Sequence, residues 1–337
     1  MAKKLLLTGS AGFIGHHVLS HLLVNTDWDI IAVASWTHKG EPHRILDDKH
    51  YQEHKHRVKI ITHDLVAPFT EVTKKEIGHV DYILNIASDS HVDRSITDPV
   101  PLVKNNVALV LNMLEFAREV KPEVFLQFST DETYGAAPGN ETFKEWATIL
   151  PSNPYSASKA CQEAIAYSYW RTYGVPLIIT NLVNVFGERQ DSEKFMAKCI
   201  KHISNDEELT IHGSTGNIGS RFYIHARNVA DALLFIVNNL KPVPFSDDVD
   251  RPSRYNITSD NEVDNLTVAT LIAKALKKPL KYTLEDFHKT RPGHDRRYGL
   301  DGTKLKEAGW TCPMNFEESL TRYVEWSVKP ENLKWLS

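Results

Sequence analysis

Short runs of consecutive apolar residues alternate along the chain with longer stretches in which apolar residues recur every three or four positions. The short runs are rich in Val, Ile and Leu and are nearly continuous, which is typical of parallel strands covered on both faces. The longer stretches have helical spacing, and each gap can hold a right-handed crossover helix. The pattern predicts strands at residues 4–8, 29–34, 58–62, 82–87, 124–130 and 177–183, and helices at residues 14–23, 103–120 and 156–172. We therefore expect an α/β fold with a doubly wound parallel sheet.

The pattern changes after about Gln190, where the segments become shorter and richer in polar and turn residues. A helical stretch at residues 265–277 precedes a strand-like run at residues 281–284. We expect a smaller C-terminal α/β lobe that packs against the sheet and binds the substrate. The predicted division is a nucleotide-binding sheet domain at residues 1–185 and this lobe at residues 186–337, with the chain crossing back between them.

Composition narrows the class of protein. The 337 residues are 42% hydrophobic and 24% charged, with a net charge of −4, so no basic excess indicates a nucleic-acid partner. The first apolar run, Leu5-Leu6-Leu7, is too short for a signal peptide or a membrane span. Three scattered cysteines indicate reduced thiols in a cytoplasmic protein. The 16 histidines contain no H-E-x-x-H motif, and we expect no metal site.

A glycine motif, Gly9-x-x-Gly12-x-x-Gly15, joins the first predicted strand to the first predicted helix. Glycines permit a tight turn and close approach of the backbone to a pyrophosphate, which the helix N-terminus attracts. A glycine triplet alone could be a simple strand–helix turn, but this context favours a Rossmann-type dinucleotide site. The residues assigned to the cofactor are Gly9, Gly12, Phe13, Ile14, Gly15, Ser35, Asp64, Leu65, Ala87, Asn106, Tyr155 and Lys159.

The choice between NAD and NADP depends on the end of the second strand. NAD-binding folds usually carry an acid there for the ribose hydroxyls. This chain reads Val33-Ala34-Ser35-Trp36 instead. Ser35 could hold the ribose diol of NAD, whereas Ser35, His38, Lys39 or Arg44 could hold the 2′-phosphate of NADP. We expect NAD and leave NADP open.

Tyr155 and Lys159 lie four residues apart at the start of a predicted helix, so both side chains share one face. An ammonium beside a phenol favours the phenolate, which can take a hydroxyl proton while the same carbon gives hydride to nicotinamide. Thr130 ends a strand on the same side of the sheet. Asp131 and Glu132 follow it, and adjacent acids at the end of a buried strand are costly for stability. They are either catalytic or two solvated loop acids.

These motifs resemble the extended short-chain dehydrogenase/reductases, and among them the nucleotide-sugar 4,6-dehydratases of the dTDP-glucose 4,6-dehydratase type. Stretches at residues 8–15, 90–95, 129–135, 153–159 and 291–298 carry the resemblance and span nearly the whole chain. The resemblance implies that Tyr155, helped by Thr130 and Lys159, oxidises C4 of an NDP-hexose. Glu132 then removes the C5 proton, Asp131 protonates the leaving C6 hydroxyl, and hydride returns to C6. The product would be a 4-keto-6-deoxy sugar.

The resemblance also implies the substrate contacts and the assembly. Ser90, His91 and Arg94 would line the sugar cleft, and Asn184 and Arg221 would contact the diphosphate. Arg291 and Tyr298 would lie near the nucleotide. Relatives usually form homodimers through two helices per subunit, here residues 103–120 and 156–172.

Two stretches depart from the family pattern, at residues 185–190 and 221–228, so the base and the sugar stay open although dTDP-glucose is expected. A 4-epimerase or a decarboxylase on the same scaffold is the alternative. A non-catalytic dinucleotide sensor is a third hypothesis, disfavoured because a sensor needs no phenolate.

Overall fold

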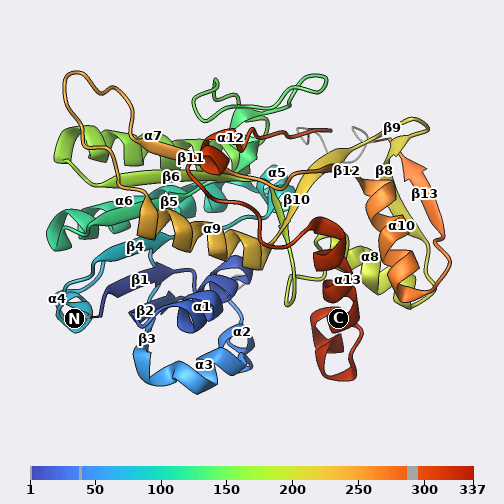
Figure 1. Ribbon diagram of the computed structural model, residues 1–337, viewed down its shortest axis with the longest axis horizontal. Helices are drawn as coiled ribbons and strands as arrows, with labels where there is room; N and C mark the ends of the chain where they lie inside the picture. The colour runs from blue at the N-terminus through green and yellow to red at the C-terminus, as the bar shows by residue number, and fades with distance from the viewer. Residues whose placement is uncertain (1, 38–39, 287–294) are drawn as a thin grey trace.

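The computed structural model describes residues 2–37, 40–286 and 295–337. Its centre is a seven-stranded sheet in which every strand pair is parallel, in the order β11-β6-β5-β4-β1-β2-β3 (Figure 1). The strands are β1 (Lys4–Thr8), β2 (Asp29–Ala34), β3 (Val58–Thr62), β4 (Tyr82–Asn85), β5 (Val124–Phe128), β6 (Leu177–Leu182) and β11 (Ser253–Ile257). The predicted doubly wound α/β fold is confirmed.

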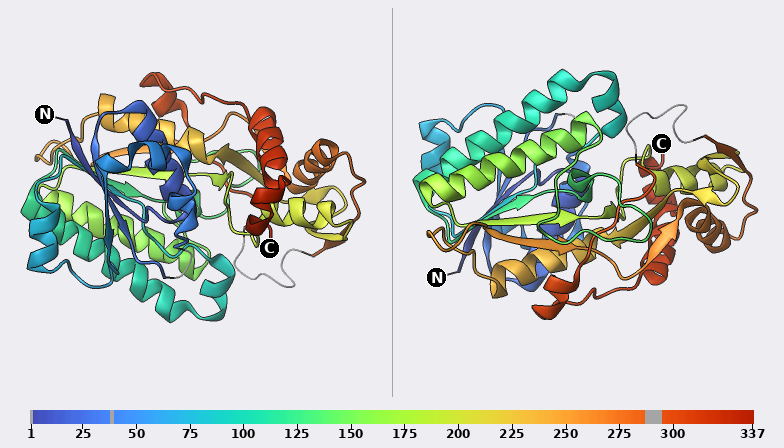
Figure 2. Two further views of the ribbon diagram at one scale, coloured as in Figure 1. Left: turned by 90° about the horizontal axis from the view of Figure 1, so that it is seen from below. Right: turned by 90° about the horizontal axis from the view of Figure 1, so that it is seen from above.

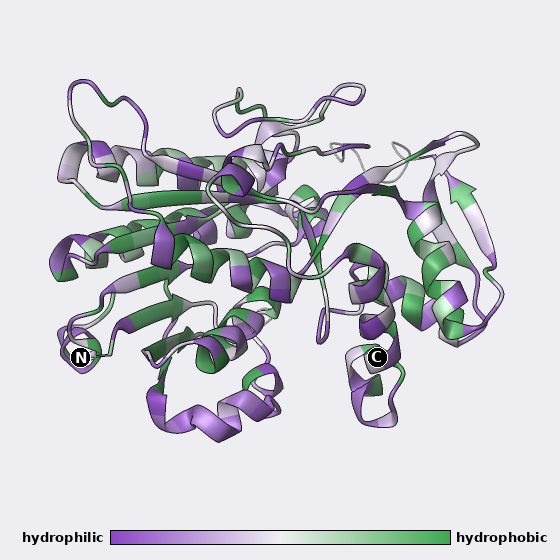
Figure 3. Cartoon of the chain, viewed as in Figure 1, coloured by the Kyte–Doolittle hydropathy of each residue, from purple (hydrophilic) through white to green (hydrophobic). Residues whose placement is uncertain are grey.

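Helices cover both faces of this sheet, which explains the continuous apolar runs of its strands. Leu5 and Leu7 pack in a core with α1 (Phe13–Asn25) and α9 (Ala226–Asn239). Leu6 points the other way, into a core with α6 (Pro99–Val120) and α7 (Pro154–Tyr173). Figure 2 shows α6 and α7 side by side on this second face. Figure 3 shows that the strands between the two helix layers are largely hydrophobic.

The remaining short elements connect these layers at their edges. They are α2 (His43–Leu46), α3 (Lys49–His54), η1 (Lys55–Arg57), α4 (Glu71–Ile77), α5 (Val92–Thr97), η2 (Asp131–Tyr134) and α12 (Thr303–Glu307).

All six predicted strands occur, but three of them end earlier than predicted. The strand predicted at residues 82–87 stops at Asn85, because the amides of Ile86 and Ala87 both donate to the Thr8 hydroxyl at 3.0 Å. Helix α7 begins earlier than predicted, at Pro154. A reciprocal pair of bonds between Asn153 and Ser156 caps its N-terminus.

The smaller lobe has its own core and two three-stranded sheets, β12-β10-β7 and β13-β8-β9. Its elements are β7 (Asn184–Phe186), α8 (Phe195–Ser204), β8 (Leu209–Ser214), β9 (Asn217–Ile218), β10 (Ser220–His225), β12 (Glu262–Asp264), α10 (Asn265–Leu276), β13 (Tyr282–Glu285), α13 (Phe316–Ser327) and η3 (Pro330–Trp335).

Two elements that follow residue 186 in the chain belong to the large sheet rather than to the smaller lobe. Strand β11 pairs with β6, and α9 packs against α1. Strand β11 carries Ser253, Arg254 and Asn256, so its sequence lacks the apolar run that marks the other strands.

No helix within the described part of the chain combines the length and the apolar character that crossing a membrane requires.

Candidate active site

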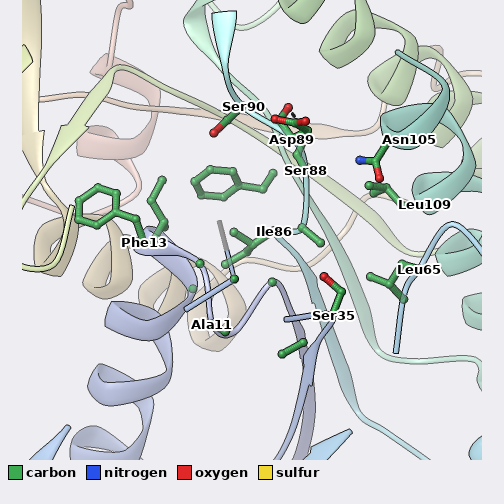
Figure 4. A pocket seen from close by; sticks show the side chains of 18 of the residues that line it. Ala11, Phe13, Ser35, Leu65, Ile86, Ser88, Asp89, Ser90, Asn105 and Leu109 are labelled. Atoms are coloured by element: carbon green, nitrogen blue, oxygen red, sulfur yellow. Dashed lines mark hydrogen bonds between the residues drawn. The ribbon is translucent and has the colours of Figure 1, made fainter. Parts of the chain in front are cut away.

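A cavity of about 250 Å³ lies at the carboxyl edge of the sheet, over the loop between β1 and α1 (Figure 4). The carboxyl ends of neighbouring parallel strands meet at this edge, where such folds bind ligands. Of the residues assigned to the cofactor, the cavity is lined by Gly9, Gly12, Phe13, Ile14, Gly15, Ser35, Asp64, Leu65, Ala87, Tyr155 and Lys159.

The glycine loop forms the floor of this cavity, and two of its glycines have no room for a side chain. Gly9 has φ +67°, and a Cβ there would lie 3.0 Å from the backbone of Ala87. A Cβ on Gly15 would lie 2.0 Å from the Gly9 carbonyl oxygen. The loop closes through a bond from Gly12 N to Gly9 O at 2.9 Å. This geometry leaves the N-terminus of α1 open to an anionic group.

Asn106 is the one cofactor residue that the structure places elsewhere. It is fully buried, and its side chain bonds the backbone N and O of Asp89 at 2.8 and 3.0 Å and the Ser158 hydroxyl at 2.9 Å. Its role in the structure is to hold the cavity wall, while its neighbour Asn105 lines the cavity. The assignment of Asn106 as a cofactor contact is therefore corrected.

Among the residues that could hold a 2′-phosphate, one lines the cavity and another lies outside its lining. Ser35 lines the cavity, and its hydroxyl hydrogen-bonds the Thr37 hydroxyl at 2.7 Å. Arg44 is buried outside the cavity lining, with its guanidinium 3.2 Å from Asp191 and 3.0 Å from the Arg189 carbonyl oxygen. His38 and Lys39 lie outside the described residues. Arg44 is thus engaged inside the protein, which favours NAD over NADP.

A second cavity of about 810 Å³ adjoins the first, and Phe13, Ser90, Ser129, Tyr155 and Lys194 line both. Three catalytic candidates, Thr130, Asp131 and Glu132, also line the second cavity. This geometry agrees with the prediction that Thr130, Asp131 and Glu132, which follow strand β5, lie near Tyr155 of helix α7. The alternative of two solvated loop acids does not hold for Asp131, which is only 4% exposed, while Glu132 is partly exposed.

Hydrogen bonds order this group of side chains. The Thr130 hydroxyl bonds Tyr155 and donates to Asp131 Oδ1 at 3.0 Å. On the other side, Glu132 Oε2 accepts from Asn153 Nδ2 at 3.2 Å and from the Tyr298 hydroxyl at 3.5 Å. Each of the two carboxyl groups therefore has its own set of partners.

The two carboxyl groups differ electrostatically. Burial, followed by the charge of Glu132, raises the pKa of Asp131 to about 7. Burial also raises the pKa of Glu132, but Asn153 and the charges of Arg221 and Lys194 oppose that rise. The arrangement favours a protonated Asp131 next to an ionised Glu132.

The sequence predicted that the Lys159 ammonium contacts the Tyr155 phenol. The structure does not show this contact. The ammonium donates instead to the Phe128 carbonyl oxygen at 2.7 Å and to Gln162 Oε1 at 2.6 Å. Burial lowers the pKa of Lys159 to about 7. Burial and then the charges of Glu132 and Asp131 raise the pKa of Tyr155 above its ordinary value, against the Thr130 hydroxyl, which lowers it.

The substrate candidates are mostly found around the second cavity. Ser90, His91, Asn184, Arg221 and Tyr298 all line it. The buried guanidinium of Arg221 lies 4.6 Å from the ring centre of Tyr298.

Two substrate candidates are not brought to this cavity by the described structure. Arg94 lies outside its lining and forms an ion pair with Asp89 at 2.6 Å. Its role as a substrate contact stays a prediction. Arg291 lies outside the described residues.

The two stretches that depart from the family pattern meet each other in the structure. Glu188 of the first stretch forms an ion pair with Arg227 of the second, and its Oε2 lies 3.1 Å from Nε2 of His225. These three residues do not line the second cavity, but Val185, Phe186 and Tyr223 of the same two stretches do.

Sequence reasoning missed Gln190 and Lys194, which line both cavities. They follow Gly187 in a loop whose spacing carries no motif, so only the fold reveals them. Within the described residues, no group of three His, Cys, Asp or Glu side chains is placed to hold a metal ion.

The model of the GDP-mannose 4,6-dehydratase family matches residues 6–323. The chain belongs to this family. The recognition of a nucleotide-sugar 4,6-dehydratase from the sequence is confirmed, and with it the expected enzyme class, a hydro-lyase.

Individual relatives match along nearly their whole length. The dTDP-glucose 4,6-dehydratase 1 of Escherichia coli K12 is 31% identical over 358 residues, covering 99% of this chain and 94% of that protein. The low-salt glycan biosynthesis protein Agl12 of Haloferax volcanii is 32% identical over 326 residues, covering 95% and 97%. The crystal structure of dTDP-glucose 4,6-dehydratase from Bacillus anthracis in complex with NAD has a TM-score of 0.84 and 27% identity, and the match covers 100% of both chains.

The glycine loop gives a first prediction for this dehydratase-family protein. Gly15→Ala should weaken NAD binding at least about tenfold, because the new Cβ would overlap the Gly9 carbonyl and open the loop. Gly12→Ala is the matched control with a smaller effect, since its Cβ would lie 3.0 Å from the same oxygen. Titration calorimetry with NAD measures both variants, and equal affinities for Gly15→Ala and the wild type would contradict the assignment.

Proposed function

We propose that the protein dehydrates an NDP-hexose to the NDP-4-keto-6-deoxyhexose with NAD as cofactor, and that dTDP-glucose is the first substrate to test. The observation that carries the proposal is a pair of adjacent acids, the buried Asp131 and the partly buried Glu132, beside Tyr155 in one cavity. Oxidation at C4 alone needs no such pair, whereas elimination of water needs an acid and a base. The named relatives from Escherichia coli and Bacillus anthracis support dTDP-glucose.

The cofactor cavity fits a dinucleotide, because its floor is a glycine loop that a single Cβ would fill. Gly9, Gly12, Ser35, Asp64 and Ala87 would hold NAD, which takes up hydride from C4 and gives it back at C6. The NAD bound to the Bacillus anthracis relative supports this choice.

In the first step, Tyr155 accepts the proton of the C4 hydroxyl while Thr130 bonds the same oxygen. Since burial and the carboxylates oppose ionisation of the phenol, the step needs positive charge nearby. Lys159, four residues along the same helix, is the cation of this chain assigned to supply it. Its low pKa makes this contribution strongest at neutral pH and below.

The second step uses the two carboxyl groups in opposite roles. The C4 ketone acidifies the C5 hydrogen, and Glu132 removes it as a proton, which C5 must regain when hydride is added at C6. Asp131 gives its own proton to the C6 hydroxyl, which leaves as water. The different environments of the two carboxyl groups favour a protonated Asp131 and an ionised Glu132, which suits Asp131 as the acid and Glu132 as the base.

Mass spectrometry with a panel of dTDP-, UDP-, GDP- and CDP-hexoses tests the proposed reaction. We expect one nucleotide sugar to lose about 18 mass units, the mass of one water. A product of unchanged mass would indicate a 4-epimerase, and loss of CO₂ from a uronic acid would indicate a decarboxylase. Either result would leave Asp131 and Glu132 without the proposed roles.

The pKa of Asp131 predicts how the rate depends on pH. Its raised pKa means that the protonated, active form is present below about pH 7 and is lost as the pH rises through that value. The turnover number should therefore fall above pH 7. Asp131→Asn should lower it by about 10²–10⁴-fold and leave only the decline caused by deprotonation of Lys159, whose pKa is also about 7. Asp93→Asn, which changes another acid of the same cavity, should keep the whole decline, and a wild-type turnover number in Asp131→Asn would contradict the assignment.

We further propose that the protein is a homodimer through α6 and α7. These helices pack together and carry exposed apolar side chains, among them Val100, Leu111 and Tyr173. Light scattering should give twice the 38.3 kDa mass of the chain, and Leu111→Glu should halve it. Val72→Glu, which changes an exposed valine on α4, is the control and should leave the mass unchanged. A wild-type mass of 38.3 kDa would contradict the dimer.

A further inference from the structure

A buried ion pair lies beneath the catalytic residues and takes no direct part in the proposed reaction. Glu163 follows Lys159 by one turn of α7, and Arg254 belongs to β11. Their side chains are 1% and 2% exposed, and Arg254 Nη2 lies 2.6 Å from Glu163 Oε2. Neither residue lines the two cavities described above, so neither can touch the substrate or cofactor there.

Glu163 holds the beginning of the catalytic turn. Its Oε1 accepts a hydrogen bond from the hydroxyl of Ser129, the residue immediately before Thr130. The same oxygen accepts from Asn181 Nδ2 at 2.8 Å. Asn181 in turn donates to the Thr130 carbonyl oxygen at 3.1 Å and to the Thr133 hydroxyl at 3.2 Å.

Arg254 holds the end of the same turn. Its Nη1 donates to the Tyr134 hydroxyl at 3.2 Å and to the Glu145 carbonyl oxygen at 3.1 Å. Tyr134 also donates to that carbonyl at 2.8 Å, which completes the attachment. The segment from Ser129 to Tyr134, which carries Thr130, Asp131 and Glu132, is therefore tied at both ends to one ion pair.

The pair is poorly explained by stability alone. Removing two charges from water costs about as much as their attraction returns, and apolar replacements of such pairs are often neutral or stabilising. Nevertheless, helix α7 supplies the negative charge of Glu163, and β11, the edge strand of the large sheet, supplies the positive charge of Arg254. The Glu163 carboxylate has a second effect on the site, because its charge raises the pKa of Lys159 against the effect of burial.

We propose that Glu163 and Arg254 are positioning residues that fix the Ser129–Tyr134 turn so that Asp131 and Glu132 can reach C6 and C5 of the sugar. The inference rests on the proposed dehydration. It predicts that loss of the pair slows the elimination of water more than the preceding oxidation, since the turn carries both carboxyl groups of the elimination but only Thr130 among the residues assigned to the oxidation. A displacement of about 1 Å in a catalytic group can slow a step on the order of 10²-fold.

The test compares Glu163→Gln, Arg254→Met and the double variant with the wild type in the presence of NAD and the substrate found by mass spectrometry. Asp81→Asn is the matched control, because Asp81 is also a paired carboxylate but lies at the opposite, amino edge of the sheet. Three quantities are measured: the turnover number, the melting temperature and the absorbance of reduced nicotinamide during turnover.

We expect Glu163→Gln to lower the turnover number about tenfold or more, with little change in KM, and to accumulate reduced nicotinamide. Arg254→Met should have the lowest melting temperature, because it leaves the Glu163 carboxylate buried without its ion partner. The double variant should regain stability but not turnover. Asp81→Asn should accumulate no reduced nicotinamide.

Two results would overturn the inference. One is a turnover number that follows the melting temperature across all variants and recovers in the double variant. The other is a Glu163→Gln variant that keeps wild-type turnover without accumulating reduced nicotinamide. A wild-type protein that dehydrates none of the nucleotide sugars would instead contradict the proposed function itself.

Discussion

Asp131 and Glu132 follow one another in the chain and line the same cavity, where the charge of Glu132 adds to burial in raising the pKa of Asp131. This arrangement depends on the position of β5 inside a parallel sheet. The strand delivers the two residues to the carboxyl edge, where the dinucleotide cavity and the larger second cavity meet. Burial then separates their proton affinities, since Glu132 has compensating donors and cations that Asp131 shares only in part. An acid and a base can thus work side by side at one pH.

The surrounding structure can be understood as the support for this arrangement. The glycine loop brings α1 close to β1, and Asn106 fixes the opposite wall of the cofactor cavity. Helix α7 carries Tyr155 and Lys159 at its capped N-terminus, and its next turn supplies Glu163. Strand β11 follows the first strands of the smaller lobe in the chain. The large sheet is therefore complete only when the chain has returned to it. The catalytic turn therefore has all its contacts only when β11 is paired with β6.

The sequence predicted the parts that depend on local pattern. Six strands, the glycine loop and the residues of the Thr130, Asp131, Glu132 and Tyr155 group follow from apolar runs and short motifs, and the fold brings them together. Strand β11 was missed because a strand buried around an ion pair carries polar residues where the pattern requires apolar ones. Asn106 was assigned to the cofactor from its place in the chain, which does not give the direction of its side chain, and the fold buries that side chain against Asp89 and Ser158. Gln190 and Lys194 reach the cavities only through the path of a loop, which no spacing encodes.

The central claim is that burial keeps Asp131 protonated near neutral pH while Glu132 is ionised. Carbon-13 NMR of the side-chain carboxyl groups, with the Asp131 resonance assigned by comparison with Asp131→Asn, measures this directly as the pH is varied. We predict that Asp131 titrates near pH 7 and that its midpoint falls in Glu132→Gln, where the neighbouring negative charge is lost. A midpoint near 4 for Asp131 in the wild-type protein would contradict the account, because the acid of the proposed elimination would then be ionised at neutral pH.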